Sequence, residues 1–220
     1  MGLPFPLLFL VVFTSLVYTT PMSNDPAVTF RKMVSDIGEL TPKERLVSAF
    51  ISIRDIPYGS ANSPTPFSVI ERNRGTAKGK HRLLKMVLTS LGYEVKDYWA
   101  RHDFRDMPIK PWPKVLEQFS KETLTGFHDF LKVRVGVKWV TVDATFDRPL
   151  AKLGFPVREW DGNSDVELPV AALETFPVVP PIDDQKRKLV AALPEEMRER
   201  RKRFLKTLKK WLEEERVTLG

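Results

Sequence analysis

The feature that most constrains the fold is a pair of alternating segments on either side of Gly136-Val137. "FLKVRV" ends at Val135, and "KWVTVDAT" begins at Lys138. In both segments apolar residues recur at every second position, which is the period of a half-buried β-strand. A two-residue linker containing glycine between such segments predicts a β-hairpin. We therefore expect residues 127–135 and 138–145 to pair as antiparallel strands.

Helical patterns precede this hairpin. Residues 26–33 and 41–53 are expected to be helices, and the second begins with Thr41, Pro42 and Glu44, a capping box with proline at the first helical position. A mostly apolar segment over residues 83–91 predicts a buried helix, which Gly92 ends.

The sheet and the C-terminal part of the chain follow. Residues 93–100 alternate as a further strand, and residues 148–184 are proline-rich and expected to be irregular. A long amphipathic helix is expected after Pro194, with Phe204, Leu208 and Trp211 on its apolar stripe. Helices followed by a short antiparallel sheet predict an α+β fold.

The net charge of +7 is concentrated near the C-terminus. Residues 185–220 hold twelve Lys and Arg against six Glu, so a basic C-terminal helix is expected, packing its apolar stripe on the domain. Nucleic acid or a membrane surface are alternative partners of this helix, less favoured because the glutamates weaken the positive field. The cations that would contact nucleic acid are Lys202, Arg203, Lys206, Lys209 and Lys210.

The chain has no cysteine, which excludes disulfides, thiolate metal sites, iron–sulfur clusters and a cysteine nucleophile. Two His-Asp pairs, His102-Asp103 and His128-Asp129, match no zinc-ligand spacing, so neither a metal nor another cofactor is predicted. Only six Asn and Gln accompany many charged residues, a composition that indicates a heat-adapted source.

The sequence predicts three regions: an apolar extension over 1–24, a domain over 25–184 and the basic helix over 185–220. The extension has no charged residue, and it can be a signal peptide, a membrane anchor or a misassigned start upstream of Met22. The last interpretation favours a cytoplasmic protein, whereas genuine residues 1–21 would indicate a secreted or membrane-anchored one.

The hairpin geometry brings a histidine and a carboxylate together. With a two-residue turn Phe130 lies opposite Asp143, so His128 and Asp143 become diagonal neighbours with Cα atoms roughly 7–8 Å apart. A carboxylate on one imidazole nitrogen fixes the tautomer and orients the ring as a general base. A three-residue turn would move Asp143 to the other face, and an unrelated His and Asp on a hairpin is the alternative interpretation.

Two longer stretches carry a family resemblance. "RGTAKGKHRLLKMVLTSLGYEV" and "HDFLKVRVGVKWVTVDATFD" resemble the transglutaminase-like superfamily, which has a papain-like fold with a Cys–His–Asp site. The resemblance covers about residues 45–147 and includes "IRDIPYG", whose Tyr58 is expected to line the pocket together with Gly75 and Thr76. It implies that His128 and Asp143 are the site histidine and aspartate, that Gly75 and Thr76 flank the nucleophile position, and that Ala77 occupies it.

An alanine cannot attack a carbonyl, and the nearby hydroxyls of Thr76 and Ser60 are poor substitutes. The resemblance thus implies a non-catalytic binding or scaffolding module for a protein or peptide ligand. The alternatives are an active thiol acyltransferase or amidase/peptidase carrying a Cys-to-Ala change, and a basic interaction protein acting through the C-terminal helix. Trp139 shares a hairpin face with Asp143 and is expected to line the cleft, whereas His81 is expected at a partly exposed helical position.

Overall fold

The computed structural model describes residues 25–107, 109, 111–179 and 182–219, so the interpretations of residues 1–24 lie outside it. Its α-helices are α1 (Pro26–Gly38), α2 (Pro42–Arg54), α3 (Pro66–Arg72), α4 (Ala77–Ser90), α5 (Ile182–Ala191) and α6 (Glu195–Leu219). Its strands are β1 (Val95–Asp103), β2 (Thr125–Val135), β3 (Lys138–Val142) and β4 (Glu174–Pro177). Short 3-10 turns, η1 (Phe104–Asp106), η2 (Glu117–Phe119) and η3 (Arg148–Leu153), lie in the connections. Within these described ranges no helix is both long and apolar enough to cross a bilayer.

The four strands form one antiparallel sheet in the order β3-β2-β1-β4, which confirms the α+β class. Val135 pairs with Lys138, so the hairpin has the expected two-residue turn. Gly136 has a φ of 59°, a left-handed conformation that glycine adopts without steric cost. The register of β2 and β3 is therefore the one that brings His128 and Asp143 to the same side.

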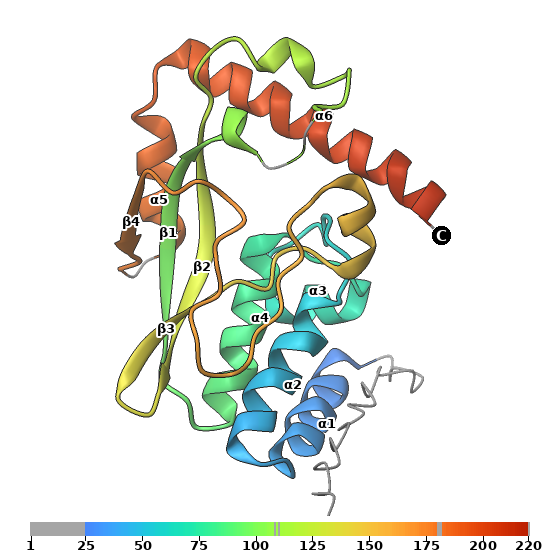
Figure 1. The fold of residues 1–220 in the computed structure, drawn as a ribbon, viewed down its shortest axis with the longest axis vertical. Helices are drawn as coiled ribbons and strands as arrows, with labels where there is room; N and C mark the ends of the chain where they lie inside the picture. The colour runs from blue at the N-terminus through green and yellow to red at the C-terminus, as the bar shows by residue number, and fades with distance from the viewer. Residues whose placement is uncertain (1–24, 108, 110, 180–181, 220) are drawn as a thin grey trace, which may run out of the picture.

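Helix α4 packs along β2, and α2, α3 and α1 lie outside it (Figure 1). Its residues Leu83, Leu84, Val87 and Leu88 are fully buried and pack in one core with the inward side chains of β2 and β3, as the sequence predicts. The capping box of α2 is also present: the Thr41 backbone N–H donates to Glu44 Oε2 at 3.1 Å. This core fixes the position of the first residue of α4 relative to the sheet.

Helix α6 crosses one end of the molecule, far from the turn of the β2–β3 hairpin (Figure 1). Its stripe of Phe204, Leu208, Trp211 and Leu212 is buried in a second apolar cluster, which includes Leu124 and Phe155. The stripe thus packs on the domain, and α6 covers the region where the sheet and the N-terminus of α4 meet.

Two elements differ from the prediction for residues 148–184. β4 pairs with the edge of β1, a non-local contact that its four residues do not signal. Helix α5 starts at Ile182, so the predicted boundary between residues 184 and 185 falls inside it. Its Lys186 forms a 2.6 Å ion pair with Asp129 of β2, which attaches this polar helix to the sheet.

Candidate functional site

The N-terminus of α4 forms one side of the candidate site. Thr76 is the extended N-cap residue, and Ala77 is the first residue of the helix. Backbone hydrogen bonds of 3.1 Å run from Gly75 N–H to Pro57 O and from Gly59 N–H to Gly75 O, which hold the preceding loop against this end. A Cβ on Gly75 would lie 2.8 Å from Lys80 Cγ, so only glycine fits here. The helix start is therefore fixed on both sides of Ala77.

The predicted histidine and aspartate meet next to this helix end. His128 Nε2 lies 2.5 Å from Asp143 Oδ2, and Asp143 Oδ1 accepts the Thr145 N–H at 3.0 Å. Burial alone would raise the pKa of Asp143, but the His128 and His81 imidazoles lower it to about 2. The ionised carboxylate accepts a hydrogen bond from Nε2–H, which leaves Nδ1 as the nitrogen that can act as a base.

His81 lies in the same cluster, and its predicted partial exposure is wrong. Its side chain is 3% exposed, and its Nε2 lies 3.9 Å from Asp143 Oδ1. Nε2 accepts the Ala144 N–H at 3.0 Å, which requires the neutral form with the proton on Nδ1. Burial lowers the pKa of His81 in agreement with this form. Its Nδ1 has no hydrogen-bond partner among the described residues.

A small cavity of about 70 Å³ lies between the N-terminus of α4 and His128. Ala77, His128 and Tyr58 all line it, as does His102 of β1. The ring centroids of His102 and His128 lie 6.5 Å apart, and burial lowers the pKa of His102 to about 4. The remaining walls are largely apolar: Phe104, Met107, Phe146, Phe155, Val170, Leu208 and Leu212. The last two belong to α6, so this helix encloses the cavity.

Lys80 lies one turn into α4 and binds backbone carbonyl groups around the site. It is fully buried, and its Nζ donates to the carbonyl oxygens of Arg54, Ile56 and Thr145 at 2.7–2.9 Å. Burial lowers its pKa to about 7, opposed by the nearby carboxylates of Asp147 and Asp143. Three carbonyl acceptors match the three protons of an ammonium group. Lys80 thereby connects the end of α2 to the segment that follows Asp143.

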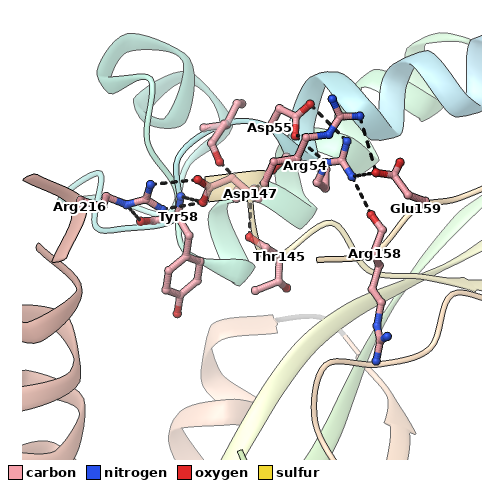
Figure 2. A network of polar contacts seen from close by, with 11 residues as sticks. Arg54, Asp55, Tyr58, Thr145, Asp147, Arg158, Glu159 and Arg216 are labelled. Carbon is pink, nitrogen blue, oxygen red and sulfur yellow. Dashed lines mark hydrogen bonds and ion pairs between the residues drawn. The ribbon is translucent and has the colours of Figure 1, made fainter. Parts of the chain in front are cut away.

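A clasp consisting of Tyr58, Asp147 and Arg216 attaches α6 to the site (Figure 2). Asp147 is 1% exposed, and its carboxylate accepts two hydrogen bonds from the Arg216 guanidinium, from Nη1 at 2.9 Å and from Nη2 at 2.6 Å. Asp147 Oδ1 also accepts the Tyr58 N–H at 2.7 Å, and Tyr58 O accepts Arg216 Nε at 3.1 Å. Burial, with the charges of Asp129 and Asp143, raises the pKa of the Tyr58 hydroxyl to about 12. Tyr58 is therefore a neutral wall residue.

Trp139 lies elsewhere, so its expected position in the cleft is wrong. Asp143 lies just beyond the end of β3, and Trp139 is four positions before it along the chain, roughly 13 Å in a strand. Its ring lies 4.1 Å from Lys96 Nζ, and it does not line the cavity of Ala77. Thr76 faces a separate groove of about 270 Å³ between the loop at Gly59 and α6.

The sequence analysis missed His81, Lys80, His102 and Asp147. His81 is four residues after Ala77, a spacing that places both on one helix face and could have indicated its burial. Asp147 and Lys80 have no such local signal, because their partners are 69 and up to 65 residues away. Among the residues described, no three His, Asp or Glu side chains are placed to hold a metal ion.

Comparisons with known proteins add little to this geometry. No protein-family model and no curated protein sequence matches the chain. One solved structure, described as "a Putative Cysteine Protease from Cytophaga hutchinsonii", aligns with a TM-score of 0.40 and 14% identity. The alignment covers 72% of this chain and 52% of that one, so this chain spans about half the length of that protein.

Proposed function

We propose that this chain is a non-catalytic, transglutaminase-like module, with a Cys–His–Asp type of site in which alanine occupies the nucleophile position. One observation carries the proposal: Ala77, the first residue of α4, lines the same cavity as His128, whose Nε2 contacts Asp143. A helix N-terminus beside an oriented imidazole is the environment that activates a thiol. Here the methyl group of Ala77 takes the place of a thiol, so the module binds a ligand and does not react with it.

The small volume of the cavity argues against a peptide substrate at Ala77. Its volume of about 70 Å³ is below that of ordinary ligand pockets, which begin near ~300 Å³. Leu208 and Leu212 of α6 line it, so a peptide has no room beside Ala77 in this arrangement. The larger groove near Thr76 and Arg74 offers a place for a peptide ligand. Peptide amides are accordingly the first ligands to screen by thermal shift.

The main test restores the thiol with Ala77→Cys, which gives a chain with a single cysteine because the native sequence has none. We expect a thiol pKa well below the ordinary value of about 8.5, because the helix end and the imidazole favour the thiolate. Titration of the thiolate ultraviolet absorbance measures this pKa even if α6 hinders reagents. Iodoacetamide at about pH 6 should alkylate the variant at least ~10-fold faster than free cysteine.

The matched control adds His128→Gln to Ala77→Cys and should return the thiol pKa toward its ordinary value. An unperturbed thiol in Ala77→Cys contradicts the proposed site. The native chain should show no turnover of activated esters or amides, and turnover inhibited by His128→Gln would refute a non-catalytic role. The alternative, an active thiol enzyme changed at this position, makes a different prediction: the natural gene encodes cysteine at position 77.

A role of α6 in binding nucleic acid has less support. Lys202, Lys209 and Lys210 form ion pairs of 4.0, 3.9 and 3.6 Å with glutamates of the same helix. These pairs leave Arg203 and Lys206 as the main exposed cations of the predicted set. An interaction through α6 would therefore depend on two cations, and the position of Ala77 beside His128 supports the first proposal better.

A further inference from the structure

One face of the sheet carries aromatic and cationic side chains that the candidate site does not use. We call it the outer sheet face, and it consists of Lys96 and Tyr98 of β1, Lys132 and Arg134 of β2, and Trp139 of β3. Lys96 pairs with Lys132, and Arg134 pairs with Trp139, so the five residues lie in adjacent rows of one pleat. The alternate residues of the same strands, Val95, Leu131, Val133 and Val140, pack in the helical core. The outer sheet face therefore points away from α4.

The side chains of this face are accessible. Lys96 and Arg134 are exposed, and Tyr98, Lys132 and Trp139 are half-buried. Each lysine stands over a ring: Lys96 Nζ is 4.1 Å from the Trp139 centroid, and Lys132 Nζ is 4.9 Å from that of Tyr98. Neither lysine forms an ion pair with a carboxylate among the described residues, whereas Arg134 pairs with exposed Glu94 at 2.6 Å. The face thus combines two ring faces with a surplus of positive charge.

We propose that the outer sheet face binds single-stranded nucleic acid. Unpaired bases stack on exposed aromatic rings, and Lys and Arg beside them contact the phosphates. The four-residue offset along β2 and the two strand spacings place the two rings roughly 16 Å apart. This distance suits contacts at separate nucleotides of one extended strand, with Lys132 between them.

Binding requires the two lysines to move from the rings to the phosphates. A cation over an aromatic ring at an exposed site is worth only about 0.5–1 kcal/mol, so this exchange costs little. Stacking of one base contributes more, about 1–3 kcal/mol. A duplex hides its base faces inside the helix, so the rings of this face favour single strands over duplexes.

The test uses the full chain and a fluorescein-labelled oligouridylate of about 15 nucleotides, followed by fluorescence anisotropy. We expect binding at about 50 mM salt that weakens at about 200 mM, with a log–log salt slope near −2 for three phosphate contacts on a single strand. Trp139→Ala should weaken binding about tenfold, while Trp139→Phe keeps a ring and should retain most of the affinity. Lys96→Gln with Lys132→Gln should make the salt slope shallower by about one unit or more.

The matched control is Lys202→Gln with Lys206→Gln on α6, at the opposite end of the molecule, which should leave the affinity unchanged. Circular dichroism melting curves verify that each variant is folded, and Trp139→Phe replaces Trp139→Ala if the latter unfolds. No anisotropy change at about 50 mM salt overturns the proposal. Equal affinity for duplex RNA overturns it as well, as does a loss of binding in the α6 variant alone. These outcomes are independent of the thiol experiments on position 77.

Discussion

Lys80 has the least ordinary environment of the individual side chains. Its ammonium group is removed from water, and three backbone carbonyls accept its protons. These carbonyls belong to the end of α2, the loop after it, and the segment that follows Asp143. A single side chain thus holds together the three pieces of backbone that frame the start of α4.

We predict that Lys80→Met destabilises the fold by at least about 3 kcal/mol. Methionine has a similar shape, but it leaves three buried carbonyl oxygens without a donor, and each costs about 1–3 kcal/mol. Urea unfolding of both proteins measures the change in the free energy of unfolding. Lys188→Met, at an exposed position on α5, is the control and should change it by no more than ~0.5 kcal/mol. A loss below about 1 kcal/mol for Lys80→Met would show that water satisfies these carbonyls.

The His128–Asp143 contact illustrates what local sequence can predict. Two alternating strands and a glycine turn fix which residues face each other, so the pair follows from the sequence with the correct register. The same parity argument groups Trp139 with Asp143, but Trp139 lies on the outer sheet face and does not line the cavity of Ala77. The spacing of His81 from Ala77 indicates a shared helix face, but its contact with Asp143 depends on the direction of α4 relative to β3, which no short-range pattern contains.

Helix α6 is the element whose attachment most affects the site. The clasp of Tyr58, Asp147 and Arg216 holds it through charges that are largely excluded from water, since the Arg216 side chain is 14% exposed and that of Asp147 1%. Leu208 and Leu212 then form one side of the cavity that contains Ala77. The clasp and the apolar stripe together hold α6 against this cavity.

Arg216→Ala is expected to destabilise the fold by about 3 kcal/mol, because it leaves the Asp147 carboxylate buried without its cation. Adding Asp147→Asn to this variant should recover part of the loss, since no charge is then left unpaired. Thermal and urea unfolding of the single and double variants give the coupling free energy. Arg203→Ala on the exposed side of the same helix should be nearly neutral. If both arginine variants lose the same small amount, the clasp contributes no more than a surface ion pair.

The elements that sequence analysis missed share a physical cause. β4 has four residues and no run of alternation, and it exists because the edge of β1 is available for pairing. α5 is rich in charged residues, and its contact with the sheet comes through Lys186, Asp129 and the indole of Trp99. In both cases a partner distant in sequence provides the stabilisation. The elements with caps or periodicity of their own are the ones that the sequence predicts: α1, α2, α4, α6, β1 and the hairpin.

At the scale of the whole molecule, all three histidines of the chain are buried in one cluster. His81 and His128 have ring centroids 6.3 Å apart, and those of His102 and His128 are 6.5 Å apart. Burial lowers the pKa values of His81 and His102, so the folded chain binds fewer protons there than the unfolded chain in mild acid. The stability of the molecule is therefore tied to pH through this cluster.

We expect acid to destabilise the protein in two windows. His102 has a folded pKa of about 4 against an ordinary value of 6.5, so its contribution is complete above pH 6.5 and is lost as the pH falls through 4. Asp143 has a folded pKa of about 2 against 3.8, so its contribution is lost between about pH 4 and pH 2. These shifts correspond to about 3 and 2 kcal/mol respectively.

Urea unfolding at a series of pH values measures both windows. His102→Phe keeps an aromatic ring and should reduce the loss of stability between pH 6.5 and pH 4. The loss between about pH 4 and pH 2 should stay unchanged. Asp143→Asn should remove the loss of stability between about pH 4 and pH 2. A stability that stays constant from pH 7 to about pH 4 would contradict the burial of neutral His102 and His81.

The buried amine of Lys80 has a practical consequence for chemical labelling. Amine-reactive reagents such as N-hydroxysuccinimide esters modify exposed lysines quickly, but they reach this nitrogen only when the surrounding backbone opens. In a peptide map the fragment that contains Lys80 should stay unacylated in the native protein and become acylated at the rate of global opening. The chain thus carries its own reporter of unfolding, readable by mass spectrometry without any added probe.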